Sequence, residues 1–258
     1  MDVDKLLTEE LGVYNGQYEL AKTLTQKALE SLTDGIQVFE YQTDGRFSFN
    51  KVICNVEFSH VQTSAMIYNF DEECNLYIRL FVYNKLSHYT RTQLTNAIAH
   101  ELMHGHIFTK RYSQKVEIND MPFLYNVSVE AIQNQGKNIL YYFCYGIYST
   151  YYQEVQSFVS QAKGEIFDLL GYNADVKVAI QKSNSYQIYY ENIKVAEKII
   201  DMEDDSIQEI ICSYFDKRGY LLTPKTVRKL CRTITKISRK ALKDICRVAV
   251  IAQREKFF

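Results

Sequence analysis

The sequence lacks the features that define several common classes of protein. Six cysteines are scattered over 258 residues with no C-x-x-C pair, which argues against a thiolate zinc site and against a disulfide framework. We therefore expect reduced, mostly buried thiols. No run of 18 apolar residues occurs, and the acidic start Met1-Asp2-Val3-Asp4 has no basic or apolar signal region. These absences predict a soluble protein without membrane contact, cytoplasmic where it is synthesised.

The charge is distributed unevenly, although the net charge is only −1. Residues 217–258 contain 13 Lys or Arg against two acids, so this segment carries +11 and the preceding 216 residues carry −12. Such a split indicates one of two things. Either the basic segment binds an acidic partner, which could be a protein or a nucleic acid, or the two oppositely charged parts of the molecule attract each other. No recognised nucleic-acid-binding motif accompanies the basic residues, so a solvated helix face explains them equally well.

Hydrophobic periodicity predicts helices first and then strands. The first 32 residues have helical spacing, and Gly12 and Gly16 are expected to divide them into two helices. A change to strand-like stretches separated by turn signals then predicts a small, mainly antiparallel sheet. The predicted strands are residues 36–41, 47–58, 65–70 and 76–83.

The second half of the chain is predicted to be mostly helical. Residues 110–135 are expected to be a looser, polar stretch, and residues 176–193 to hold one strand or hairpin. The predicted helices are 138–150, 151–170 and most of 195–258, with breaks near Gly219 and Pro224. The fold class is therefore α+β, with a first domain over 1–194 whose core is 36–171, and a basic helical region over 195–258.

One motif indicates a chemistry. His100-Glu101-Leu102-Met103-His104 is an H-E-x-x-H sequence, in which residues four apart share one face of a helix, so both imidazoles can reach one metal ion. Glu101 can then hold a water at that ion. Thr90 and Gln93 match a capping box, which predicts that this helix begins near Arg91.

A catalytic zinc site usually takes a third protein ligand. Ile107 and Lys110 stand where the metzincin extension needs Gly and His, so that class is excluded. Glu154 is the preferred third ligand, because a carboxylate on an otherwise apolar helix is costly to bury unless it is paired or binds a metal. Glu130 is the main rival.

The arrangement resembles the gluzincin branch of zincin metallopeptidases, in which a sheet, an H-E-x-x-H helix and a later glutamate helix build the site. It is also similar to small predicted metallopeptidases of bacteria and their phages. The resemblance covers roughly residues 36–171 and implies a zincin-like sheet packed on the motif helix. It implies one catalytic zinc held by His100, His104 and Glu154, with Glu101 as general base.

Further roles follow from this chemistry. An oxyanion donor is expected near the ligands, and His106 and Tyr151 are the candidates. The strand that ends near Asn84 could serve as the edge to which an extended peptide or protein substrate adds.

Three functions remain open from the sequence. The first is a zinc metallopeptidase. The second is a zincin-fold structural or processing component of a larger assembly, such as a phage particle, in which the basic C-terminus docks on an acidic partner and activity is vestigial. The third is a nucleic-acid-binding regulator with a metal-stabilised core.

Overall fold

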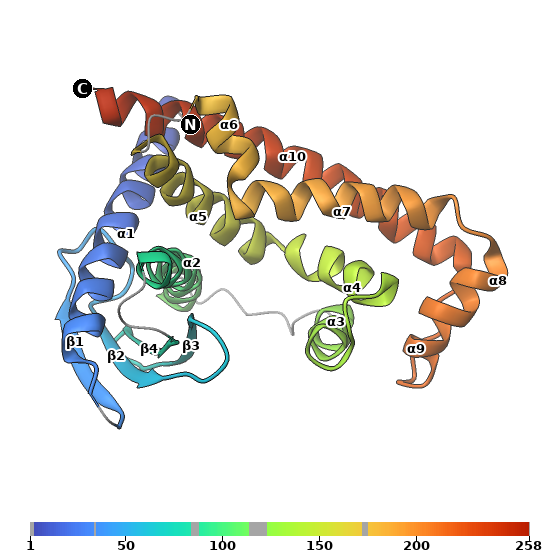
Figure 1. The fold of residues 1–258 in the computed structure, drawn as a ribbon, viewed down its shortest axis with the longest axis horizontal. Helices are drawn as coiled ribbons and strands as arrows, with labels where there is room; N and C mark the ends of the chain where they lie inside the picture. The colour runs from blue at the N-terminus through green and yellow to red at the C-terminus, as the bar shows by residue number, and fades with distance from the viewer. Residues whose placement is uncertain (1–2, 34, 84–87, 114–122, 172–174, 258) are drawn as a thin grey trace. The chain divides into compact units, whose positions relative to one another are not determined.

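The computed structural model describes residues 3–33, 35–83, 88–113, 123–171 and 175–257. The protein is α+β, with one four-stranded sheet and a mostly helical remainder (Figure 1), which confirms the predicted fold class at this level. The first elements are α1 (Val3–Ser31), β1 (Gln37–Gln42), β2 (Lys51–Phe58), β3 (Ser64–Phe70), β4 (Asn75–Val82) and α2 (His88–Ser113). The later elements are α3 (Phe123–Asn134), α4 (Ile139–Ser149), α5 (Tyr152–Gly171), α6 (Val176–Lys182), α7 (Asn184–Ile200), α8 (Asp204–Ile207), the π-helical η1 (Gln208–Cys212), α9 (Ser213–Asp216) and α10 (Pro224–Phe257).

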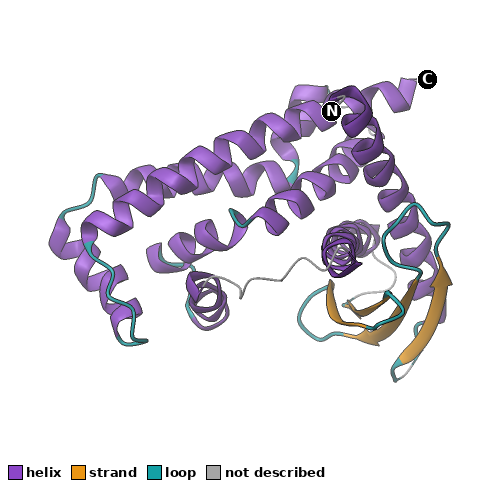
Figure 2. Ribbon diagram, turned by 180° about the vertical axis from the view of Figure 1, so that it is seen from behind, coloured by secondary structure: helices purple, strands orange, loops and turns teal. Residues whose placement is uncertain are grey.

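The chain forms two compact units, each with its own buried core. The first contains α1, the sheet, α2 and residues 156–168 of α5; the second contains α3, α4, the two ends of α5 and α6 to α10. All strands of the described residues belong to the first unit, and the described residues of the second are helices and loops (Figure 2). Helix α5 is thus continuous through both units.

The sheet has the strand order β1-β2-β4-β3 and is mixed. Its outer pairs, β1–β2 and β3–β4, are antiparallel as predicted, but the central pair β2–β4 is parallel. Hydrophobic alternation sets which face of a strand is buried and does not encode which neighbour it pairs with, so the parallel pair was missed. Strand β4 has partners on both sides, whereas β3 is an edge strand with a register irregularity between Ile67 and Asn69.

Helix α2 lies across one face of the sheet through its apolar stripe (Figure 1). Leu94, Ile98 and Leu102 are completely buried in the core that includes the strands, as their spacing predicts. The helix begins at His88, so Thr90 lies inside it and the expected start near Arg91 was wrong. Gly105 lets α2 approach Leu76 of β4, because a Cβ at that position would overlap the Leu76 side chain.

Helix α1 runs without interruption from Val3 to Ser31, so the expected division at Gly12 and Gly16 was wrong. A glycine lowers helix propensity by about 1 kcal/mol, which tertiary packing readily offsets. Leu24 and Ala28 are completely buried in the first core and supply that packing. The helix therefore holds together because one face of it is covered.

Two stretches of the second unit differ from the sequence prediction. Residues 123–134 form α3 instead of a loose segment, and residues 176–193 belong to α6 and α7 instead of a strand or hairpin. The Asp175 side chain accepts from the Lys177 amide and the Ser183 side chain from the Tyr186 amide, so two N-caps override the strand-like β-branched and aromatic composition. Residues 194 and 195, the predicted domain boundary, both lie inside α7.

The C-terminal region follows its sequence signals closely. Gly219 has a φ of 83°, a left-handed conformation that suits glycine, and Pro224 occupies the first position of α10. Cys54, Cys144, Cys212 and Cys231 are buried free thiols, as expected. No helix in the described part of the chain combines the length and apolar composition that a membrane span requires.

We predict that Gly105→Ala destabilises the protein. Alanine gains up to about 1 kcal/mol of helix propensity, but overpacking against the completely buried Leu76 costs about 1–3 kcal/mol, so the free energy of unfolding should fall. Urea denaturation measures the change. Gly136→Ala is the matched control, because no atom lies within 4 Å of a Cβ there. A Gly105→Ala variant that is as stable as Gly136→Ala, or more stable, would contradict the prediction.

Candidate metal centre

The two histidines of the motif lie side by side on α2. They are four residues apart, which is about one helical turn, and are 8% and 7% exposed, respectively. Their Nε2 atoms lie 3.0 Å apart, so the two rings direct nitrogen atoms at one point in space. Buried imidazoles that converge in this way form a typical pair of metal ligands.

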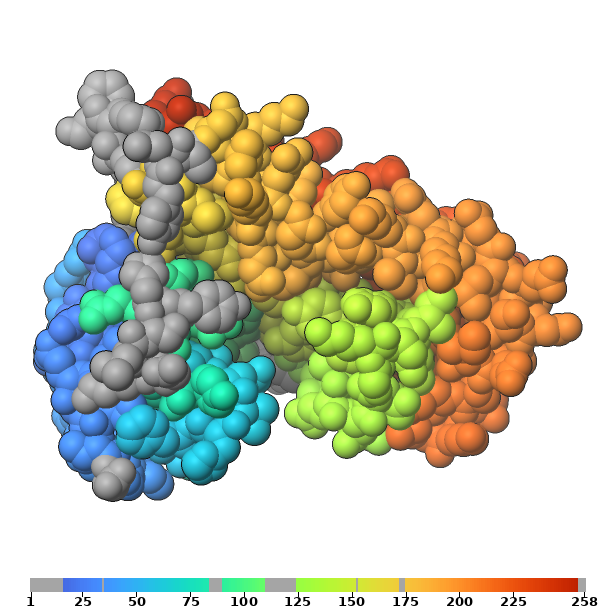
Figure 3. Space-filling model, viewed as in Figure 1, coloured from blue at the N-terminus to red at the C-terminus, as the bar shows by residue number. Residues whose placement is uncertain are grey.

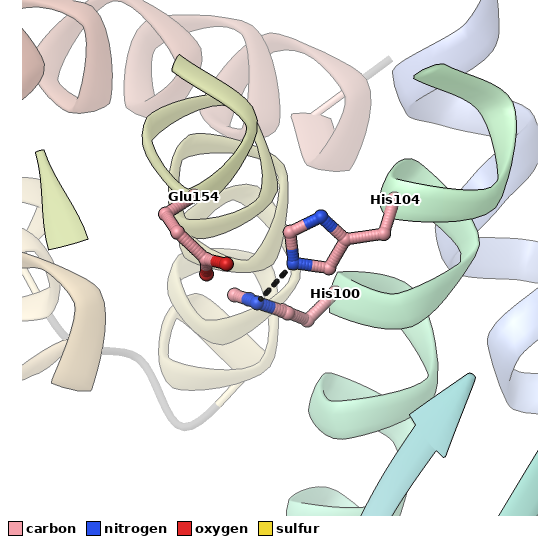
Figure 4. Close-up of side chains that lie close together, drawn as sticks. All are labelled: His100, His104 and Glu154. Atoms are coloured by element: carbon pink, nitrogen blue, oxygen red, sulfur yellow. Dashed lines mark hydrogen bonds between the residues drawn. The ribbon is translucent and has the colours of Figure 1, made fainter. Parts of the chain in front are cut away.

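Glu154 is the third member of the group. It lies in the first turn of α5, where the positive end of the helix dipole favours a carboxylate, and is 2% exposed. Figure 4 shows its carboxylate directed toward His100 and His104. One ligand atom from each of the three buried residues lies within 4.8 Å of the others, so the group could hold a metal ion.

The donor set fits a zinc ion in chemistry and in spacing. Two imidazole nitrogens and one carboxylate oxygen are common ligands of catalytic zinc. Nitrogens bound tetrahedrally at about 2.0–2.1 Å lie about 3.4 Å apart, close to the 3.0 Å separation of the two Nε2 atoms. The separation of the two histidine nitrogens is therefore close to the one that a bound zinc ion requires.

Helix α5 is fixed against the motif helix within the first unit. The Phe158 ring, one helical turn after Glu154, packs edge-on against the His100 ring with centroids 4.7 Å apart. The buried Gln17 of α1 donates from Nε2 to the carbonyl of Ala99, and its Oε1 accepts from the Ser160 hydroxyl at 2.6 Å. One amide of α1 therefore ties the helix of the histidines to the helix of the glutamate.

A hydrogen-bond donor to Glu154 comes from within the second unit, to which both residues belong. The Tyr125 hydroxyl of α3 donates to Glu154 Oε1 at 3.0 Å. Burial, together with neighbouring negative charges that include Glu154, raises the pKa of Tyr145 and of Tyr189, so these phenols stay protonated near the carboxylate. Sequence reasoning missed Tyr125, because it stands in the stretch that was expected to be loose and no pattern links it to a residue 29 positions later.

Glu101 lies about 100° around α2 from His100, on the side of the edge strand. Its Oε2 accepts a hydrogen bond from the Ile67 amide of β3 at 3.0 Å. This amide lies next to the register irregularity of β3, a feature that often re-aims groups near functional sites. The Glu101 carboxylate is half-buried. It is not a member of the group formed by His100, His104 and Glu154.

The remaining sequence candidates have other neighbours. His106 is two residues after His104, on the opposite side of α2, where its Nδ1 accepts from the Ser48 amide at 3.2 Å. Tyr151 packs edge-on against Tyr125 with centroids 4.9 Å apart, so it supports the residue that contacts Glu154. Glu130, the rival ligand, is exposed and paired with Arg218 at 2.7 Å. The structure therefore groups Glu154, and not Glu130, with the two histidines.

Comparisons of this chain with protein-family models, with curated proteins and with solved structures find no match. The case for a function therefore depends on the geometry and chemistry of the site.

We predict that His104→Ala and Glu154→Ala each abolish stoichiometric zinc binding at neutral pH, because each removes one of three ligands. Metal analysis after equilibrium dialysis measures the zinc content. Glu130→Ala is the matched control for loss of a glutamate and should keep one zinc per chain, since its partner is Arg218. Zinc retained in Glu154→Ala but lost in Glu130→Ala would reverse the ligand assignment.

We further predict that Tyr125→Phe weakens zinc binding by about 10–100-fold, the usual effect of losing a hydrogen bond to a ligand. Competition with a chelator of known affinity measures the change. Tyr141→Phe on α4 removes a hydroxyl from a partly buried tyrosine and should leave the affinity unchanged. Identical affinities of the two variants would show that Tyr125 does not orient Glu154.

Proposed function

We propose that the protein is a zinc-dependent metallopeptidase that hydrolyses peptide bonds with an activated water. The observation that carries the proposal is the buried group of His100, His104 and Glu154, which belongs to an H-E-x-x-H helix and a later helix. Buried ionisable side chains that converge without an ion are costly. A catalytic zinc explains their burial and their spacing together.

Three protein ligands leave one coordination position for water or substrate, which is the pattern of catalytic and not of structural zinc. Zinc bound there supplies a water with a pKa lowered to about 7 and polarises the carbonyl of the scissile bond. The cysteines do not compete for this role, because none of them belongs to the group that could hold a metal among the described residues.

Glu101 is the proposed general base. Its carboxylate accepts the proton of the attacking water and passes that proton to the leaving amine nitrogen. The hydrogen bond from the Ile67 amide to Oε2 restricts the orientation of this carboxylate. A restricted orientation beside the ligands suits a proton-transfer group.

The edge strand offers a site for an extended substrate. An edge strand pairs on one side only and can add a further strand on the other side through its backbone groups. Asn84 lies outside the described residues, and the strand before it, β4, is central, so the expectation that this strand forms the edge was wrong. The edge strand on the side of Glu101 is β3. We propose that the backbone of an extended substrate pairs with this strand.

We assign the fold to the zincin type and the site to its gluzincin branch as part of the same proposal. A sheet, an H-E-x-x-H helix packed on it and a later helix with a glutamate follow one another in the required order. The similarity to small metallopeptidases of bacteria and phages belongs to this proposal too. It is supported by the site and not by any matched relative.

The test is Glu101→Gln, which keeps the size of the side chain and removes the base. Peptidase activity on a fluorescence-quenched peptide library should fall by at least about 100-fold, while one zinc per chain remains bound. Glu72→Gln, at an exposed turn, is the matched control and should keep full activity. A zinc-loaded wild-type protein that cleaves no peptide or protein substrate would overturn the proposal.

A further inference from the structure

We propose that α10 and α7 form a binding surface for the phosphate backbone of duplex nucleic acid. A groove of about 580 Å³ lies between the two helices, within the second unit. Five of the eight residues that line it are cations of α10. They are Arg232, Lys236, Arg239, Lys240 and Lys243.

The groove cations are part of a longer stripe along one helix. At 100° per residue, these five side chains fall within an arc of roughly 100° on α10. Lys225 and Lys229 precede them in the same arc, and Arg247 and Arg254 follow them. All nine are exposed. From the first to the last, the stripe extends for about 43 Å along the helix axis, since each residue adds about 1.5 Å.

Internal acids neutralise little of this charge. Arg239 pairs with Glu197 of α7 at 3.1 Å, and Arg247 pairs with Asp244, the one acid among the described side chains of α10, at 2.9 Å. The cations Arg232, Lys236, Lys240 and Lys243 form no ion pair with an acid of the described residues. Like charges three or four residues apart disfavour a helix, so an external anion would relieve a repulsion that the fold leaves in place.

The opposite face of α10 is already occupied. Val227, Cys231, Ile234, Ala241 and Ile245 are buried in the second unit. Figure 1 shows α7 and α10 side by side, and in Figure 3 α7 (yellow to orange) lies in front of α10 (red). A basic amphipathic helix that inserts into a membrane surface or binds in the groove of a partner protein needs its apolar face free. Both modes are therefore disfavoured.

The composition of the groove favours phosphates over an acidic protein. Protein partners bind mainly through buried aromatic or aliphatic anchors, but Ile200 is the one apolar side chain that lines the groove. Duplex nucleic acid presents a regular row of phosphates, with about one charge per 1.7 Å of helix axis, and cations and hydroxyls suffice to bind it. The stripe matches the length of about 12 base pairs. Without aromatic side chains for stacking, binding should be independent of sequence.

The full-length protein is titrated against a fluorescent 20-base-pair duplex of mixed sequence, with anisotropy measured between 50 and 200 mM NaCl. Wild type should bind at 50 mM and lose at least tenfold in affinity by 200 mM. Lys236→Glu with Lys240→Glu should lower the affinity at least tenfold. The slope of log affinity against log salt should become shallower by about 2.

The matched control is Lys137→Glu with Lys177→Glu, two exposed lysines off the stripe, which changes the net charge equally and should bind within about threefold of wild type. Lys236→Gln with Lys240→Gln should give an intermediate affinity. His104→Ala should bind the duplex as wild type does, so this outcome is separate from the peptidase proposal. Failure of the wild type to bind, or an equal loss in the control, would overturn the inference. The inference would also be overturned if a polyglutamate peptide or phosphatidylserine vesicles bound more tightly than the duplex.

Discussion

The burial of the Glu154 carboxylate is the constraint on which the account of this molecule depends. A carboxylate that is 2% exposed loses its hydration, and such a loss costs several kcal/mol unless hydrogen bonds or a cation compensate. The Tyr125 hydroxyl supplies one hydrogen bond, and the imidazoles of His100 and His104 converge on the same place. A divalent cation could bind all three side chains at once.

Several packing contacts hold the helices that carry His100, His104 and Glu154 in place. Gln17 of α1 ties α2 to α5, Phe158 packs on His100, and Gly105 allows α2 to approach the sheet closely. The sheet places the edge strand β3 beside Glu101 through the Ile67 amide. These contacts are mostly buried and lie on regular helices and strands, and a rigid frame of this kind holds ligands in place better than loops do. The basic stripe of α10 has a separate chemistry.

The sequence predicted the features that depend on local spacing. The i,i+4 histidines, the apolar stripe of α2 and the helix after Tyr151 follow from helical period, and Glu154 stood out because its neighbours are apolar. Tyr125 and Gln17 could not be found, because each acts through a partner 29 or more residues away that no local pattern identifies. The parallel pairing of β2 with β4 was also missed, because local alternation does not identify a strand's neighbours. Helices α6 and α7 were missed because their N-cap residues outweighed a strand-like composition.

X-ray absorption spectroscopy at the zinc edge of the zinc-loaded, dialysed protein tests the central claim most directly, because it reports the identity of the ligand atoms. The account predicts one zinc per chain with only nitrogen and oxygen neighbours at about 2.0–2.2 Å, two of them showing the multiple scattering of imidazole. A sulfur neighbour at about 2.3 Å, or the absence of bound zinc after dialysis, would contradict it.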